Sequence, residues 1–421
     1  MRSPDILLNG IDATTGAYLT PALSVERISR LARGESLNAD PMNELRALRQ
    51  AQEPSFGLPW GTDAQDLAQA GWGVVFPHDA NADLRRALAP LLEHRASQAA
   101  GLYKVFDGTA GHRPGESARA WLARQGAGPG QPQVDKVPYY LLVVASPERI
   151  PFRFQYEIGV NYAVGRVGFD SREEYARYAQ SVVAFERAGA ASRRACIFGV
   201  RNEDDTATRL SADQLCTPLA AALEARSAAQ GWRVEKLLAQ DASKTNLTAL
   251  LNGGAPPALL FTASHGIGFP KDHALQTRHQ GALLCQDWPG PMGPAHPIPP
   301  DWYFCADDVR DDARLSGMIA FHFACYGGGT PRLDEYAHRS GSRNEIASKA
   351  FLAQLPQRLL SAPGGGALAV VGHVERAWGY SFQWPGIGEE ASTFRNCLGA
   401  MMDGARIGVA MESFTLRYAD L

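Results

Sequence analysis

The sequence lacks long apolar runs and a strong charge of either sign. Nowhere do about 18 apolar residues follow one another, as a membrane-spanning helix requires, and residues 1–10 hold an apolar patch too short for a signal peptide. The formal net charge is -3 and the pI is about 6.4, a balance that does not favour nucleic acid or an anionic membrane surface. We therefore expect no membrane and no nucleic-acid partner.

Cysteine is also sparse, and no two cysteines form a C-x-x-C pair. The six copies are scattered along the chain: Cys196, Cys216, Cys285, Cys305, Cys325 and Cys397. This spacing resembles neither a disulfide framework nor a zinc ribbon, so most of these cysteines are expected to be small buried residues of a reducing, cytoplasmic protein. The histidines before residue 135 also lack the clustered spacing of a metal site, and no metal or cofactor is expected.

What the chain does contain is enough apolar sequence for more than one core, with 421 residues that are 45% hydrophobic. A stretch rich in Gly, Pro and Gln at 125–133 predicts a boundary, with an N-terminal region of unclear role at 1–135 before it. Beyond it, strands and helices alternate over 136–421, as in a mostly parallel sheet flanked by helices. This α/β domain is expected to comprise a smaller lobe at about 136–190 and a larger one at 191–421.

The expected elements follow from apolar periodicity and from start and stop signals. Strands are expected at 72–76, 137–145, 195–200, 232–238, 258–263, 317–324 and 366–372. Helices are expected at 41–52, 80–96, 171–187, 212–230, 243–251, 344–360, 389–402 and 405–417.

Two of these strands end abruptly in a reactive side chain. The apolar run at 258–263 leads to His265, and the run at 317–324 leads to Cys325. Because ligands collect beyond the carboxyl ends of parallel strands, both side chains project into one cleft if the two strands are neighbours. An imidazole beside a thiol can take its proton and later protonate a leaving amine, so Cys325 is predicted to be a nucleophile and His265 its general base.

Glycines beside this dyad suit the same chemistry. A tetrahedral oxyanion needs hydrogen-bond donors, which the backbone amides of Gly266 and Cys325 can supply. A side chain at position 266 would obstruct the approaching carbonyl group, and Gly327 is expected to leave open space beside the sulfur.

These motifs resemble the clan of cysteine peptidases that includes the caspases, gingipains, legumain and separase, and most closely its gingipain-like and caspase-like bacterial members. Beyond Ser-His265-Gly and Ala-Cys325, the similarity includes four further segments, at 139–144, 150–154, 162–166 and 365–372. The resemblance covers about two thirds of the chain, from near 136 to the end. It implies a caspase-like fold, a His265–Cys325 dyad with the amides of Gly266 and Cys325 as the oxyanion hole, and endopeptidase activity without a cofactor.

The sequence departs from the clan in two ways. Phe323 stands where caspases carry Gln, and Tyr326-Gly327 stands where they carry Arg-Gly, which argues against a preference for aspartate. Gingipains have a secretion leader that is missing here, which favours a cytoplasmic, regulated protease.

The substrate pocket is expected to be acidic. Asp334 and Glu335 follow the glycines after the nucleophile, and Glu375 follows the apolar run at 366–372. Carboxylates in such a pocket would favour Arg or Lys at the P1 position of a protein or peptide substrate. A second acidic group, at Asp307, Asp308, Asp311 and Asp312, suits calcium in its chemistry but lacks the spacing of an EF-hand, so a solvated loop is expected there.

Two other functions stay open on this reading. The same thioester chemistry serves an amidase or acyltransferase acting on a small amide, which would show a narrow closed pocket. A catalytically silent interaction module would instead use residues 1–135 to dock a regulatory partner.

Overall fold

The computed structural model divides the chain into two compact units, Met1–Phe56 and Gly57–Leu421. It describes residues 57–59, 61–128, 130–189, 192–227, 231–290, 297–334, 345–377 and 391–414. Four short strands are described by their backbone: β1 (Asp5–Ile6), which pairs with β2 (Leu23–Ser24), and β16 (Gln383–Trp384), which pairs with β17 (Gly388–Glu389). The helix predicted at 41–52 lies outside the described residues.

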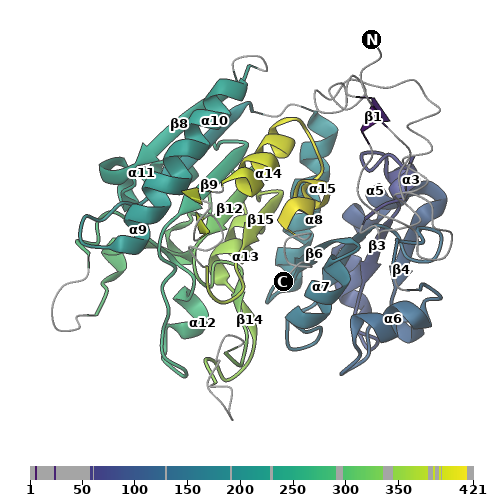
Figure 1. The fold of residues 1–421 in the computed structure, drawn as a ribbon. Coiled ribbons are helices and arrows are strands. Elements are labelled where there is room, and N and C mark those ends of the chain that lie inside the picture. The colour runs from purple at the N-terminus through teal and green to yellow at the C-terminus, as the bar shows by residue number, and fades with distance from the viewer. Residues whose placement is uncertain are drawn as a thin grey trace. The chain divides into compact units, whose positions relative to one another are not determined.

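A five-stranded parallel sheet forms the centre of the larger lobe (Figure 1). Its order is β15-β12-β9-β7-β8, and the strands are β7 (Arg194–Gly199), β8 (Arg233–Leu238), β9 (Leu259–Ala263), β12 (Ile319–Phe323) and β15 (Ala369–Gly372). The mostly parallel sheet predicted from the sequence is thereby confirmed.

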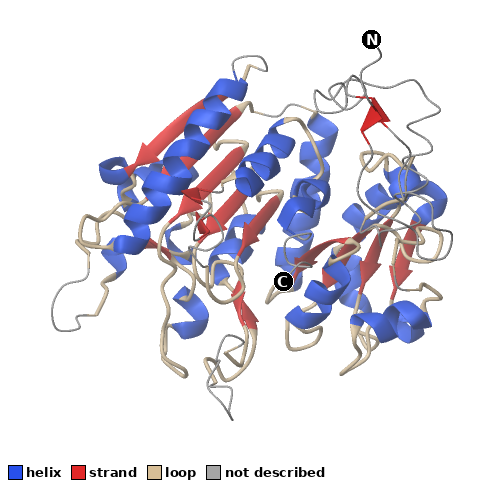
Figure 2. Cartoon of the chain, in the orientation of Figure 1, coloured by secondary structure: helices blue, strands red, loops and turns tan. Residues whose placement is uncertain are grey.

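Helices cover both faces of this sheet, because successive strand residues point to opposite sides (Figure 2). Ile197, Phe261 and Phe321 pack in one core cluster with helices α10 (Thr217–Ser227) and α14 (Ser392–Met402). The intervening residues, such as Leu260, pack in the opposite cluster with α11 (Lys244–Asn252) and α13 (Gln354–Leu360). The apolar runs recognised in the sequence are therefore strands buried on both faces.

The smaller lobe contains a second parallel sheet, of order β4-β3-β5-β6. Its strands are β3 (Trp72–Val75), β4 (Tyr103–Phe106), β5 (Tyr140–Val144) and β6 (Ala163–Val167). Two of them precede residue 135 and two follow it, so the sheet runs across the expected boundary. The Gly- and Pro-rich segment at 125–133 connects α6 (Ala118–Arg124) to β5 and is a loop within the lobe.

Helix α8 (Arg172–Ala188) connects the two sheets and packs against both. Its N-terminus has a capping box between Ser171 and Glu174, and it ends at Gly189, whose φ of 67° is left-handed. From α8, Arg177 donates to the Ser361 carbonyl oxygen at 2.8 Å, and Tyr178 donates to that of Leu368 at 3.4 Å. One hydrophobic cluster consequently contains residues from both sheets.

The remaining helices are short. Around the smaller sheet they are α3 (Leu67–Ala70), α4 (Ala82–Ala87), α5 (Ala89–Ala99), η1 (Ala100–Leu102), η2 (Gly108–Ala110) and α7 (Phe152–Gly159). In the larger lobe they are α9 (Thr206–Ser211), η3 (Ala212–Cys216), η4 (Ala239–Asp241), α12 (Gln276–His279), η5 (Pro300–Trp302), η6 (Ala306–Asp308) and α15 (Ile407–Ala410).

Several predicted helices differ in extent from those observed. The helix expected at 80–96 is divided into α4 and α5, and the one expected at 405–417 contains the short α15. The helix expected at 212–230 begins earlier, at Thr206, because Asp205 caps it. The helix expected at 344–360 is limited to α13, because β14 (Phe351–Leu352) pairs instead with β13 (Gly329–Thr330).

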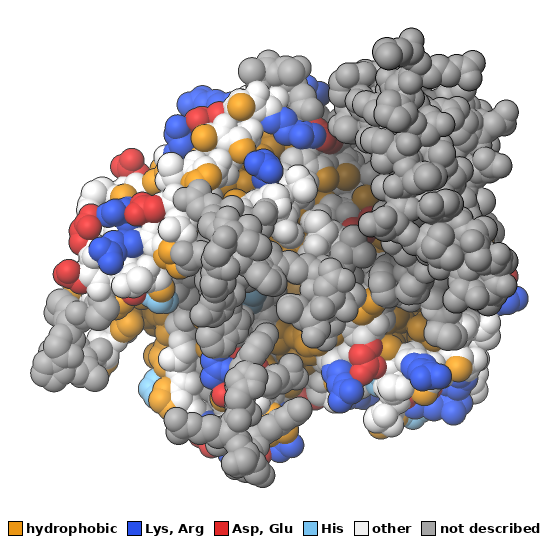
Figure 3. All heavy atoms as spheres, in the orientation of Figure 1, with side chains coloured by type: hydrophobic (Ala, Val, Ile, Leu, Met, Phe, Trp, Pro, Cys, Tyr) orange, Lys and Arg blue, Asp and Glu red, His pale blue; other side chains and the backbone are white. Residues whose placement is uncertain are grey.

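Opposite charges are interspersed on the described surface over α9 and α10 (Figure 3). Ion pairs there join Arg201 to Asp213 and Lys236 to Glu224. Within the described residues, no helix has both the length and the apolar character needed to cross a bilayer.

Candidate active site

His265 and Cys325 lie just beyond the carboxyl ends of two neighbouring strands. In the parallel ladder of β9 and β12, Ala263 pairs with Phe323, and the Ser264 N–H donates to the Phe323 carbonyl oxygen at 3.2 Å. Each reactive residue therefore stands two positions after the last paired residue of its strand. The condition set by the sequence, that the two strands be neighbours, is met.

Cys325 differs from the other cysteines in its exposure. The other five are buried, whereas Cys325 is partly exposed. Burial still raises the pKa of its thiol, while the Ala377 N–H, 3.4 Å from Sγ, and the charge of Arg376 act in the opposite direction. Burial raises the pKa of Cys216 and Cys397 to about 12, with no compensating group. Cys325 is thus the cysteine placed to react with a molecule from solvent.

The turn after Cys325 is held tightly by its neighbours. Tyr326 has a left-handed φ of 59°, and its N–H donates to the Glu375 carbonyl oxygen at 2.5 Å. A Cβ atom on Gly281 would lie 2.2 Å from the Tyr326 carbonyl oxygen, so only glycine fits there. These contacts turn the chain sharply away from the sheet and leave Cys325 at the sheet edge.

His265 is oriented by Asp205, a residue that the sequence analysis did not select. His265 Nε2 and Asp205 Oδ2 are 2.9 Å apart, and the Asp205 carboxylate is 12% exposed. Partial burial opposes ionisation of Asp205, but the hydrogen bonds from Thr208 and the charge of His265 outweigh it and lower the pKa of this carboxyl group. The Trp288 ring packs edge-on against the imidazole, with 5.7 Å between ring centroids.

The fold explains why Asp205 reaches His265. Strand β7 is the neighbour of β9, and Asp205 is the N-cap of α9, in the connection that follows β7. Its Oδ2 accepts the Thr208 N–H at 2.9 Å, which fixes the carboxylate at the same sheet edge as His265. A polar residue that caps a helix after a buried strand was the available signal in the sequence.

The two amides expected to bind an oxyanion lie close together. A Cβ atom on Gly266 would be 1.7 Å from the Cys325 carbonyl oxygen, so the two backbones are in direct contact. On its other side, this segment pairs with β10 (Leu283–Leu284), through Leu284 N–H to the His265 carbonyl oxygen at 2.9 Å. Within the described residues, neither the Gly266 nor the Cys325 amide donates to a backbone carbonyl group.

The predicted pocket residues are arranged around Arg376. Both Asp334 oxygens accept from its guanidinium, at 2.8 and 2.9 Å, and Arg376 also contacts the Glu375 carboxylate. The side chains of Asp334 and Glu375 are 12% and 2% exposed. Two carboxylates therefore contact the same guanidinium, close to Cys325. Glu335 lies outside the described residues.

Gly327 occupies a different place from the open space that the sequence suggested. It is buried, and a Cβ atom on it would be 3.2 Å from the Ala324 carbonyl oxygen. Its backbone packs against Gly372 of β15, where an added Cβ atom would come within 2.7 Å of it. Close packing of two backbones accounts for this glycine.

Two other histidines lie beneath the site. His322 points to the side of β12 opposite to Phe321 and Phe323, as strand alternation predicts, and its Nδ1 is 2.9 Å from Thr262 Oγ1. Burial lowers the pKa of His322 and of His373 to about 4, so both are neutral at pH 7. They belong to the interior of the lobe.

The acidic group considered for calcium is dispersed among cations. Lys244 contacts Asp308 at 2.7 Å, Arg310 contacts Asp312 at 2.7 Å and Arg358 contacts Asp311 at 2.6 Å. Each of these carboxylates points to its own cation, so they do not converge on one point.

Comparison with family models and with curated proteins finds no match. Among solved structures, the chain is similar to a protease with 12% identity and a TM-score of 0.45, over 74% of this chain and 61% of that one, less than two thirds of its length. It is also similar to the Arg-specific cysteine proteinase gingipain R (RgpB), with 12% identity and a TM-score of 0.49, over 82% of this chain and 72% of that one. A third similar structure is a complex of the pro- and mature domains of Porphyromonas gingivalis RgpB. Its sequence identity is 11% and its TM-score is 0.42, over 79% of this chain and 68% of that one.

Proposed function

We propose that the chain is a cysteine endopeptidase in which Cys325 is the nucleophile and His265 the general base. The observation that carries the proposal is that a partly exposed cysteine and a carboxylate-oriented histidine end adjacent parallel strands. Because Asp205 engages Nε2 of His265, Nδ1 is the nitrogen left to exchange a proton with the thiol.

The reaction follows from these groups. His265 takes the thiol proton, and Sγ of Cys325 attacks the carbonyl carbon of the scissile bond. The C–N bond breaks while the imidazolium returns the proton to the leaving amine, and a thioester remains. Water, deprotonated by His265, then hydrolyses the thioester, releasing the acid and regenerating the thiol. No cofactor enters these steps.

The oxyanion formed in both halves of the reaction is assigned to the amides of Gly266 and Cys325. Their backbones are in contact, and neither amide is committed to a backbone carbonyl group in the described residues. Donors that are already oriented stabilise developing charge without reorganisation, which is worth about 2.7–4 kcal/mol for one such donor in a serine protease.

A basic P1 residue is the proposed preference. Asp334 and Glu375 place two carboxylates, both in contact with Arg376, close to Cys325, and carboxylates are the groups that recognise a cationic side chain. Since both Asp334 oxygens bond Arg376, a P1 side chain would have to share or displace that cation. The proposal extends to a protein or peptide substrate in the cytoplasm, with the N-terminal region as a docking surface for a regulatory partner.

The first experiment is cleavage of a mixed peptide library by the wild type and by Cys325→Ala, read by mass spectrometry. We expect internal cuts from the wild type, with Arg or Lys before the cut, and none from Cys325→Ala at unchanged thermal stability. Cys285→Ala, which removes a fully buried thiol, is the matched control and should keep cutting.

Two results would contradict the proposal. Turnover of small amides without internal peptide cuts would favour an amidase. A folded wild type whose Cys325 fails to react with peptidyl electrophiles would favour a silent interaction module.

A further inference from the structure

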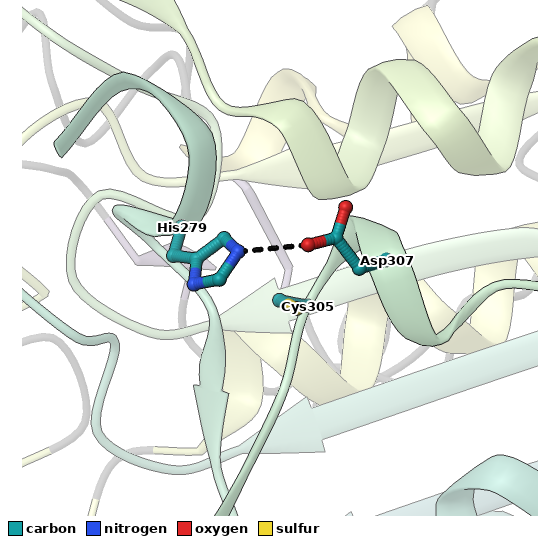
Figure 4. A group of neighbouring side chains, drawn as sticks. All are labelled: His279, Cys305 and Asp307. Carbon is teal, nitrogen blue, oxygen red and sulfur yellow. Dashed lines mark hydrogen bonds and ion pairs between the residues drawn. The ribbon is translucent and has the colours of Figure 1, made fainter. Parts of the chain in front are cut away.

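Three potential metal ligands, His279, Cys305 and Asp307, lie close together at a second site (Figure 4). His279 ends α12, Cys305 follows β11 (Tyr303–Phe304), and Asp307 lies in the helical turn after it. One donor atom from each lies within 4.8 Å of the other two, and His279 Nε2 and Asp307 Oδ2 are 3.0 Å apart. His279 and Cys305 are buried, whereas the Asp307 side chain is 46% exposed.

We propose that His279, Cys305 and Asp307 bind a zinc ion, with water as the fourth ligand. Imidazole nitrogen, thiolate sulfur and carboxylate oxygen together are the donor set that zinc prefers, while calcium and magnesium prefer oxygen alone. Zinc bonds of about 2.0–2.3 Å place neighbouring ligands roughly 3.3–3.8 Å apart, so donor atoms that lie within 4.8 Å of one another need approach by about 1.5 Å at most. The exposed side of Asp307 gives the ion a path from solvent.

Protons balance in this binding step. The S–H bond of Cys305 breaks as the sulfur–zinc bond forms, and one proton leaves to solvent for each ion bound. Binding should therefore strengthen as the pH rises.

Neighbouring side chains already bond to His279 and Asp307, and zinc must bind alongside them or displace them. The Tyr303 hydroxyl lies 2.8 Å from His279 Nδ1, so it can accept the Nδ1–H while Nε2 binds the ion. Arg278 contacts Asp307 Oδ2 at 3.0 Å, and zinc must share this oxygen with it or take the other one. The ion would thus replace the His279–Asp307 bond and keep the one to Tyr303.

Zinc at this position would stabilise the segment that supports the catalytic histidine. Leu283 of β10 pairs with Phe304 of β11, and the Ile267 N–H donates to the Ala282 carbonyl oxygen at 2.9 Å. His279 stands just before β10 and Cys305 just after β11, and because Leu283 pairs with Phe304 the ion would join the two strands at one end of this antiparallel ladder. The spacings 305 - 279 = 26 and 307 - 305 = 2 match no familiar zinc motif, which explains why the sequence did not predict the site.

The test uses the full chain carrying Cys325→Ala, so that the catalytic thiol contributes no metal signal. After chelator treatment, the protein is titrated with Co²⁺ followed by absorbance and, separately, with Zn²⁺ by calorimetry in buffers of different ionisation enthalpy. We expect one ion per chain, a cobalt–thiolate charge-transfer band that Zn²⁺ abolishes, one proton released per ion and a raised melting temperature.

Variants identify the ligands. Cys305→Ala should remove the thiolate band, and Asp307→Asn, at an exposed position that leaves the fold intact, should weaken binding at least tenfold. Cys285→Ala and Asp301→Asn are matched controls that should bind as the parent does. The proposal is overturned if the folded parent shows no thiolate band, if the band persists in Cys305→Ala, or if Asp307→Asn binds with unchanged affinity. None of these readouts depends on peptidase activity.

Discussion

Replacing Asp205 by alanine tests whether the carboxylate orients His265 for catalysis. The bond to Nε2 is 2.9 Å long, and hydrogen bonds to charged groups contribute about 1.5–3 kcal/mol. If that energy is realised in the transition state, at about 1.4 kcal/mol per tenfold change in rate, kcat/KM for peptide cleavage falls about ten- to hundredfold. Initial rates with a fluorogenic peptide chosen from the library measure this directly.

Asparagine at the same position separates charge from geometry. Oδ2 of Asp205 accepts from both Thr208 N–H and His265, and an amide oxygen there can still accept from both. Only the charge is lost, so we expect a smaller fall, about fivefold for about 1 kcal/mol. The pKa of Asp205 is lowered from its ordinary value of 3.8, so the carboxylate is ionised throughout the range from pH 8 to 5. The difference in kcat/KM between the wild type and Asp205→Asn should therefore persist over this range.

The alanine variant also loses a helix cap, which costs about 1 kcal/mol of stability. Ser117→Ala is the matched control, because Ser117 caps α6 through the Ala120 N–H at 3.2 Å and lies in the other lobe. It should lose similar stability and keep full activity. If Asp205→Ala cleaves within twofold of the wild type while its stability falls as in Ser117→Ala, Asp205 is only a helix cap and the assignment is refuted.

Three further changes test the site and the fold. Gly266→Ala places a Cβ atom 1.7 Å from the Cys325 carbonyl oxygen and should reduce kcat at least a hundredfold, as expected for a displaced oxyanion donor. Gly165→Ala is the control, because its Cβ atom meets Leu142 at 3.8 Å, and it should keep its kcat. Equal activity of the two variants would contradict the close contact at Gly266. Arg376→Met removes the cation that Asp334 and Glu375 both contact and should lower the free energy of unfolding, measured in urea, by about 3 kcal/mol. Adding Asp334→Asn should restore part of this loss in the double variant. Additive losses of stability would show that the groups are independent. The ion pair of Glu186 with Arg95 and its hydrogen bond with His94 overcome its burial and lower its pKa from 4.5 to about 2. Glu186→Gln should therefore cost about 2 kcal/mol of stability at pH 7, a difference that closes as the pH falls from 4.5 to 2; a difference independent of pH would rule out the ion pair as its cause.

The larger sheet, and the positions of His265 and Cys325 beyond the ends of two neighbouring strands, could be predicted because the signals for them are local in the sequence. Strands β9 and β12 are buried on both faces, so they appear as unbroken apolar runs, and each run ends at a polar reactive residue. His322 could be separated from Cys325 by alternation alone. What these patterns share is that the deciding information lies within a few residues.

The rest depends on contacts that a linear pattern does not contain. Asp205 is one of three consecutive acidic residues with Glu203 and Asp204, and only its register at the end of β7 distinguishes it. Strands β4 and β6 are short and partly polar, with Lys104 and Arg166 inside them, so packing between strands rather than propensity determines them. The site at His279, Cys305 and Asp307 is likewise assembled by the pairing of β10 with β11.

Asp205, His265 and Cys325 come from the ends of β7, β9 and β12, three consecutive strands of one sheet. Covalent continuity between His265 and Cys325 therefore plays no part in aligning them. A chain cut once between β10 and β11 would remain a single body, because the β9–β12 ladder and the cluster of Phe261, Phe321 and Phe394 join the two fragments. A cut in that connection would therefore leave the reacting groups in register.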